Sequence, residues 1–187
     1  QALTTVEELE RQNGSLPTGN FYDADHKIPY EIVTHEGRLS LQATRGTESV
    51  RAPMMFVVGS GLSGLTFLSP RDANELQERR LSFDNVSREW DYTSGQENSK
   101  PSGLEEALGD LSAGRGQKCL ACHSTLLVQN GAHVDLDRSQ WGVSCERCHG
   151  PGRQHVEAAE RGEFTQPLLR HRADWLKALQ HVDADPG

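Results

Sequence analysis

Cys119-Leu120-Ala121-Cys122-His123 and Cys145-Glu146-Arg147-Cys148-His149 repeat one pattern, C-x-x-C-H, and together they use all four cysteines of the 187-residue chain. Two thiols three positions apart can each bond to one of the two vinyl groups of a single porphyrin, and the histidine that follows can ligate its iron. The sequence therefore predicts two covalently bound haem c groups. Cys119, Cys122, Cys145 and Cys148 would form the thioethers, and His123 and His149 would be the proximal iron ligands.

Zinc binding and disulfide formation are the rival uses of these cysteines. Two C-x-x-C pairs can hold zinc, but residues 123–144 separate them here, which is 22 residues, slightly more than the usual 15–20. A zinc ribbon also needs no histidine directly after each pair, and disulfides explain neither histidine. Haem attachment is therefore the favoured interpretation.

The net charge and the apolar content of the chain indicate which binding partners are expected. The chain carries a formal net charge of −8, which argues against nucleic acid and anionic membranes and suits a basic patch on a redox protein. No run of 18 apolar residues is present, so we expect no membrane span. Hydrophobic residues make up 35% of the chain, which is compatible with a core completed by porphyrins and with a poorly folded haem-free protein.

The cellular compartment follows from the motif. Covalent haem attachment takes place outside the cytoplasm, so we expect a periplasmic or otherwise exported protein. The chain begins at Gln1 rather than at methionine, which is expected if a signal peptide has been removed or a domain excised.

We expect an α+β fold, in which a small β-rich N-terminal segment precedes a mainly helical segment with the dihaem motifs. The expected division is an N-terminal helix and linker at 1–19, a β-rich segment at 20–90 and the dihaem region at 91–187; one compact domain overall is the alternative. Sequence patterns predict helices at 4–12 (with Thr4 and Glu7 as a capping box), 104–111, 154–161 and 168–180, a hairpin of 28–34 with 38–44, strands within 50–58 and 65–68, and a loop at 91–102.

A glycine motif in the middle of the chain imitates a nucleotide-binding turn. Gly59-Ser-Gly-Leu-Ser-Gly64 matches G-x-G-x-x-G and follows an apolar run. A nucleotide site needs a helix directly after this turn, whereas residues 66–70 are rich in strand formers and end at a proline. We therefore interpret the motif as a glycine turn between strands.

The ligand on the opposite face of each iron is less clearly marked. His155 is the strongest candidate, because Gly150-Pro151-Gly152 predicts a turn that brings a new helix back towards the haem pair. That turn is too tight for His155 to reach the iron of His149, so we assign it to the haem of Cys119 and Cys122. His26 is a weaker candidate for the second haem, as is His133, and an open iron position is the remaining option.

The stretch from Gly142 to His155, Gly-Val-Ser-Cys-Glu-Arg-Cys-His-Gly-Pro-Gly-x-x-His, resembles the signature of multihaem c-type cytochromes. That group includes nitrification-type tetrahaem cytochromes and pentahaem nitrite reductase, and the likeness is strongest to multihaem domains found beside tetratricopeptide repeats in exported bacterial proteins. It covers about residues 20–157 and includes the Gly-Ser-Gly turn and the serine after the first motif. The resemblance implies that His155 is a distal ligand. Relatives often carry a histidine where this chain has Leu62 and Ser63, and they continue into further C-x-x-C-H motifs.

Three functions remain open at this stage. The first is electron transfer by a dihaem cytochrome between redox proteins, which requires no catalytic residue. The second is an open, five-coordinate haem that binds or reduces a small ligand such as nitric oxide, carbon monoxide, peroxide or a nitrogen oxide. The third is a docking domain in which the β-rich segment binds a partner.

Overall fold

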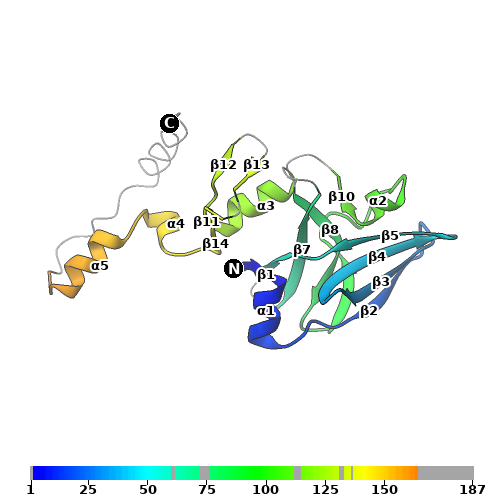
Figure 1. The fold of residues 1–187 in the computed structure, drawn as a ribbon, viewed down its shortest axis with the longest axis horizontal. Helices are drawn as coiled ribbons and strands as arrows, with labels where there is room; N and C mark the ends of the chain where they lie inside the picture. Colours follow the sequence, from blue (N-terminus) through cyan, green and yellow to red (C-terminus); the bar gives the residue numbers. More distant parts are fainter. Residues whose placement is uncertain are drawn as a thin grey trace.

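The computed structural model describes residues 2–59, 62–71, 76–111, 115–130, 133–135 and 137–163. Antiparallel β-structure dominates these residues, and the helices are short (Figure 1). No helix within them is long and apolar enough to cross a membrane.

The first sheet is an antiparallel meander that, in the described part of the chain, has the order β2-β3-β4-β5. Its strands are β2 (Gly19–Asp23), β3 (Ile28–His35), β4 (Arg38–Arg45) and β5 (Glu48–Pro53). β3 and β4 pair from Tyr30 with Ala43 to His35 with Arg38. This pairing confirms the predicted hairpin.

The second sheet has the order β1-β6-β7-β8-β10 among the described strands, with β9 also paired to β8. Its strands are β1 (Ala2–Thr5), β6 (Phe56–Gly59), β7 (Gly64–Pro70), β8 (Leu76–Asp84), β9 (Glu89–Tyr92) and β10 (Gly109–Asp110). The longest of them, β8, pairs with three neighbours, β7, β9 and β10.

The two sheets share one apolar core, which also receives the helix α2 (Leu104–Ala107). Its buried members include Ile28, Tyr30, Leu41, Val57, Phe67, Leu81, Phe83 and Leu104, together with Met54 between β5 and β6 and Leu108 just after α2. The Tyr30 hydroxyl donates a hydrogen bond to the carbonyl oxygen of Ala107 at 3.0 Å, within this core. Residues 104–108 thus pack with the β-rich part of the chain.

Helix α1 (Val6–Asn13) confirms the predicted N-terminal helix, with its cap one residue later than expected. The hydroxyl oxygen of Thr5 accepts a hydrogen bond from the backbone N–H of Glu8 at 3.1 Å. Thr5 is the last residue of β1 and directly precedes α1, which is the position of an N-cap.

The glycine motif lies between two strands, as expected: Gly59 ends β6 and Gly64 begins β7, and residues 60–61 lie outside the described part of the chain. The two strands pair antiparallel, with Phe56 opposite Leu68. Gly59 has a φ of +152°, and a Cβ there would lie 2.5 Å from the carbonyl oxygen of Gly64. The glycine is thus required by the close approach of two backbone segments.

The predicted mainly helical character of the haem-motif segment is wrong. Its described helices are short: α3 (Arg115–His123), α4 (Glu146–His149) and α5 (Arg153–Glu160). Between the motifs the chain pairs with itself, β11 (Ser124–Leu126) with β14 (Gln140–Trp141) and β12 (Gln129–Asn130) with β13 (His133–Val134). A C-x-x-C-H motif needs only about one helical turn, so it imposes no helix on the residues that connect two copies.

The other helix predictions fare differently. The helix expected at 104–111 ends at Ala107, because β10 follows and packs tightly against β8. A Cβ on Gly109 would lie 2.1 Å from the carbonyl oxygen of Glu78. The helix predicted at 154–161 is confirmed as α5, and the one at 168–180 lies outside the described residues.

Candidate functional site

The first motif occupies the last turns of α3, which packs on β8 (Figure 1). Cys119, Cys122 and His123 stand at positions i, i+3 and i+4, so they share one side of the helix. Leu120 is fully buried in a second apolar cluster with Leu3, Phe56, Leu68, Leu76 and Val134. Gly116 permits this approach, because a Cβ there would lie 2.3 Å from the carbonyl oxygen of Leu76.

The His123 imidazole is half-buried at the end of α3. Its Nδ1 atom is buried and has no hydrogen-bond partner among the described residues. Burial lowers the pKa of His123 below its ordinary value near 6.5. The neutral ring is the form that can ligate iron.

A buried carboxylate stands beside the first motif. The Cys119 thiol donates to Oε1 of Glu78 in β8 at 3.7 Å, and Glu78 is only 6% exposed. The other carboxylate oxygen, Oε2, accepts a hydrogen bond from Nε2 of Gln96 at 2.9 Å. Two hydrogen-bonded side chains therefore lead away from Cys119 into the protein.

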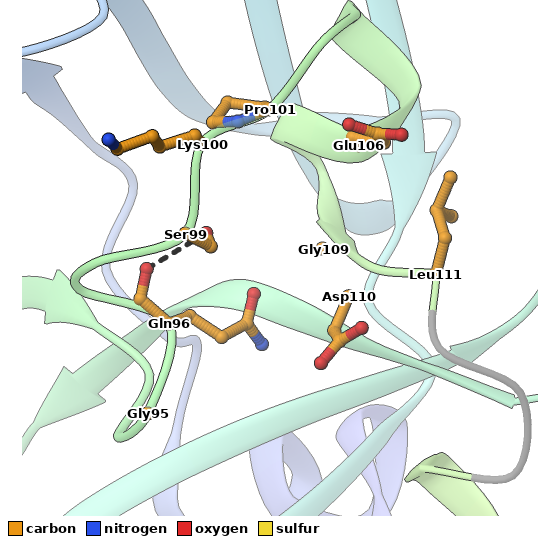
Figure 2. Close-up of a pocket in the computed structure, with 9 residues that line it drawn as sticks. All are labelled: Gly95, Gln96, Ser99, Lys100, Pro101, Glu106, Gly109, Asp110 and Leu111. Atoms are coloured by element: carbon orange, nitrogen blue, oxygen red, sulfur yellow. Dashed lines mark hydrogen bonds between the residues drawn. The ribbon is translucent and has the colours of Figure 1, made fainter.

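Gln96 also lines a cavity of about 330 Å³ on the far side of this path (Figure 2). Figure 2 shows Gln96 and Asp110 pointing towards one another across the cavity, with Lys100 and Glu106 on its rim. Ser99 forms part of the wall and donates to the carbonyl oxygen of Gln96 at 3.0 Å. Through Gln96 and Glu78, this cavity is connected to the first cysteine by hydrogen bonds.

The second motif lies at the opposite end of the described chain from the first sheet, on α4 (Figure 1). Cys145 precedes this single helical turn, and Cys145, Cys148 and His149 are all exposed. A largely apolar cavity of about 570 Å³ opens beside them, lined by Cys145 and His149 and, from α5, by His155 and Val156. Its volume lies within the range of ordinary ligand pockets.

The predicted turn at Gly150-Pro151-Gly152 joins α4 to α5, but α5 leads away from α4 instead of folding back onto it (Figure 1). Gly150 has a φ of +78°, and the Gly152 N–H donates to Oε1 of Glu146 at 2.7 Å. The structure thereby brings His155 to the cavity of Cys145 and His149, whose described lining includes no residue of the first motif. Which of the two irons His155 ligates stays a prediction.

The two motifs are joined to one another. β11 directly follows the first motif, β14 lies just ahead of the second, and the two strands pair antiparallel. In addition, Nη2 of Arg147 donates to the carbonyl oxygen of Ala121 at 2.5 Å. The structure thus brings the two C-x-x-C-H motifs into direct contact.

His26 lies on the turn between β2 and β3, in the first sheet. Its Nδ1 lies 2.9 Å from Oδ2 of Asp23, and the same oxygen accepts a hydrogen bond from Nη2 of Arg80 at 3.0 Å. No described contact joins His26 to either motif, and its role as a distal ligand stays a prediction. The side chain of His133 lies outside the described residues.

The residues present suit haem c. Each motif offers two cysteine thiols that form no disulfide and one imidazole, which is the donor set for two thioethers and one axial iron ligand. The orphaned Nδ1 of His123 and the apolar cavity beside His149 fit a large, mostly apolar ring. Among the described residues, no three His, Cys, Asp or Glu side chains converge to hold a bare metal ion.

Comparison with known proteins agrees with this donor set. Residues 79–150 match the family model of cytochrome c554 and c-prime. The matched range begins in β8 and includes both motifs, and it supports a c-type cytochrome, a class with covalently bound haem c and a role in electron transfer.

A solved structure and the curated proteins add little. The crystal structure of the outer cell wall cytochrome OcwA is similar over 66% of this chain and 25% of its own, with 19% identity and a TM-score of 0.39. The chain thus spans about a quarter of that protein, and a likeness this weak carries no argument. No curated protein matches the chain.

Sequence reasoning missed Glu78, and it treated Arg147 only as a candidate hydrogen-bond donor at an open haem, not as a contact to the first motif. Glu78 lies 41 residues before Cys119, and no local pattern links the two. Arg147 occupies one of the unspecified positions of C-x-x-C-H, where the chemistry of haem attachment places no demand. Only the three-dimensional structure identifies their contacts.

Proposed function

We propose that this chain is a dihaem c-type cytochrome that transfers electrons between redox proteins outside the cytoplasm. The observation that carries the proposal is the direct contact between the two motifs through Arg147 and Ala121. Because each motif would hold one haem, contact between the motifs favours a short path for an electron between the irons.

In this proposal the residues divide into three roles. Cys119, Cys122, Cys145 and Cys148 hold the two rings as thioethers. His123 and His149 are the proximal ligands, and the burial that lowers the pKa of His123 favours the neutral ring that can bind iron. His155 is the distal ligand of the haem at Cys119 and Cys122, and His26 is the weaker candidate for the other haem.

The environment of the chain follows from the same chemistry. Covalent haem attachment occurs outside the cytoplasm, so the protein is exported. Its partners are redox proteins, and its net charge of −8 favours partners with a basic docking surface.

The cavity beside His149 supports a second candidate function. Cys145, Cys148 and His149 are exposed there, and the cavity has a volume of about 570 Å³. A haem at this motif with an open sixth position would bind a small ligand, and Arg153 in the cavity wall would supply a hydrogen-bond donor.

Optical spectroscopy of the exported holoprotein tests the proposal. We expect two haems per chain by pyridine haemochrome, fully low-spin iron, and a spectrum that carbon monoxide leaves unchanged. A high-spin component that shifts with carbon monoxide would favour the open haem instead. Protein that carries no haem after export would contradict both functions.

Substitution tests the distal ligand. His155→Ala should convert one haem to high spin, and His155→Met should return it to low spin with a higher potential. Repeating His155→Ala in chains that lack one cysteine pair, Cys119 with Cys122 or Cys145 with Cys148, assigns His155 to one haem. His35→Ala, an exposed histidine at the β3–β4 turn, is the control.

A further inference from the structure

We infer that Arg147 is a positioning residue that sets the geometry of the haem pair. This inference rests on the proposed dihaem function. Arg147 and Ala121 occupy the same position of their motifs, the residue before the second cysteine. The guanidinium of one motif therefore bonds directly to the backbone of the other, at 2.5 Å.

The acceptor suits this bond. Ala121 lies in the last turn of α3, which ends at His123. Carbonyl groups in the last turn of a helix lack intrahelical partners and carry the negative end of the helix dipole, so they favour a cationic donor. Arg147 is half-buried, which shields the bond from water more than an exposed contact.

The backbone segments next to the two motifs lie side by side, and hydrogen bonds of Thr125 connect them. The Thr125 hydroxyl donates to the carbonyl oxygen of Gly142 at 2.9 Å. It also accepts a hydrogen bond from the N–H of Ser144 at 2.9 Å. Through Ser144, whose hydroxyl oxygen accepts a hydrogen bond from the Glu146 N–H at 3.3 Å, these bonds position the start of α4, but none of them reaches Cys148 or His149.

Arg147 acts on the turn that carries Cys148 and His149. Helix α4 has only four residues, and Cys145 provides no side-chain cap for it. So short a helix has little intrinsic stability, and its orientation depends on contacts beyond itself. Because two thioethers and an iron–imidazole bond would fix each ring to its motif, a bond that orients α4 against α3 also orients one haem against the other.

Charge and geometry can be separated at this position. Lysine keeps the positive charge of Arg147 but lacks the planar fork of donors, whereas methionine has a long side chain with neither charge nor donor. An effect of charge alone would appear only in Arg147→Met. An effect of geometry would appear in both variants.

The test compares Arg147→Lys and Arg147→Met with wild type as full-length holoproteins. The control is Arg161→Met, because Arg161 is an exposed arginine after α5 that pairs with Glu163 and not with a motif. Pyridine haemochrome first counts the haems. Circular dichroism in the Soret band then reports coupling between the two rings, and electron paramagnetic resonance reports coupling between the ferric irons.

We expect two haems in every variant and a split Soret signal in wild type and Arg161→Met. Arg147→Met should lose the splitting and Arg147→Lys should weaken it. Unchanged splitting in both Arg147 variants would overturn the inference, and so would wild type with two haems and no splitting. Loss of a haem in both variants would overturn it too, since Arg147 would then serve attachment. Wild type with fewer than two haems would instead contradict the proposed function.

Discussion

Charged side chains are buried along β8, and each forms hydrogen bonds with other buried or half-buried residues. Arg80 is fully buried and bonds to Asp23 of β2 at 3.0 Å. Arg79 is 2% exposed and donates to Ser69 and Gln77, and burial lowers its pKa to about 10. Buried charges are tolerated only with such compensation, so removing one partner leaves the other uncompensated.

Asp23 shows how this network responds to pH. Burial raises its pKa, but hydrogen bonds from the backbone and ring of His26 outweigh that effect and hold the pKa below its ordinary value of 3.8. The folded protein therefore binds fewer protons at Asp23 than the unfolded chain does in mildly acidic solution. The stabilisation is complete above about pH 4 and is lost as the pH falls through the lowered pKa.

We expect Asp23→Asn to destabilise the protein by about 3–5 kcal/mol at pH 7, because Arg80 loses its buried partner. The free energy of unfolding of the variant should also fall less steeply at acid pH, because asparagine has no carboxylate to protonate. Urea unfolding at several pH values between 2.5 and 7 measures both effects. Asp25→Asn, exposed on the same turn, should follow wild type. An acid slope equal to that of wild type in Asp23→Asn would contradict the prediction.

Glu78 places a buried carboxylate next to Cys119, so it should affect the first haem. A nearby negative charge stabilises the ferric state, and Glu78→Gln should raise the midpoint potential of that haem by tens of millivolts, an order of magnitude from Coulomb's law in a partly polar interior. Spectroelectrochemical titration measures the shift. Glu48→Gln, exposed in the first sheet, should show none, and equal shifts of both haems would count against a local effect.

Among the elements, those with a clear period were predictable from sequence. β3 alternates buried and exposed residues ahead of a Glu36-Gly37 turn, and α1 carries a threonine cap with glutamate after it. Strands as short as β11 to β14 contain too few residues to show a period. The sequence therefore did not distinguish them from helix.

The strand β8 was not predicted from the sequence, for a different reason. Its residues 77–80 are Gln-Glu-Arg-Arg, which is typical of an exposed surface, yet all four are buried. Residues from distant parts of the chain form hydrogen bonds with them: Asp23 accepts from Arg80, and Gln96 donates to Glu78. The candidate site was likewise predictable only in part. The two motifs are contiguous in sequence and could be recognised, whereas the contact of Glu78 with Cys119 exists only in the folded chain.

The link between β11 and β14 can be weakened at Thr125. Thr125→Val keeps the shape but leaves the Gly142 carbonyl and the Ser144 N–H without this partner, which should cost about 1–3 kcal/mol of stability. Soret circular dichroism of the holoprotein should weaken as well. Thr44→Val, whose hydroxyl bonds to Ser49 at an exposed site, should change stability by no more than about 0.5 kcal/mol. Equal effects of both substitutions would contradict a special role for Thr125.

For the whole molecule, the position of the main core bears on how folding depends on haem. Every buried residue of the core shared by the two sheets and α2 precedes residue 109, so no residue of either motif belongs to it. The second cluster, with Leu120, joins α3 to the second sheet. The low hydrophobic content of the sequence is compatible with a haem-dependent fold, but this core is closed by protein side chains.

We therefore expect the haem-free protein, made by changing all four motif cysteines to alanine, to keep its two sheets. Its far-ultraviolet circular dichroism should retain the β signal, and backbone amides of β3, β4, β7 and β8 should stay protected in hydrogen exchange. Amides of α4 and α5 should exchange much faster than in holoprotein, because exposed Cys145, Cys148 and His149 pack on no protein core. Loss of protection in β3 and β4 would mean that haem insertion is needed to fold the whole chain. Protection confined to the sheets would mean that the β-rich part folds first and presents both motifs for attachment.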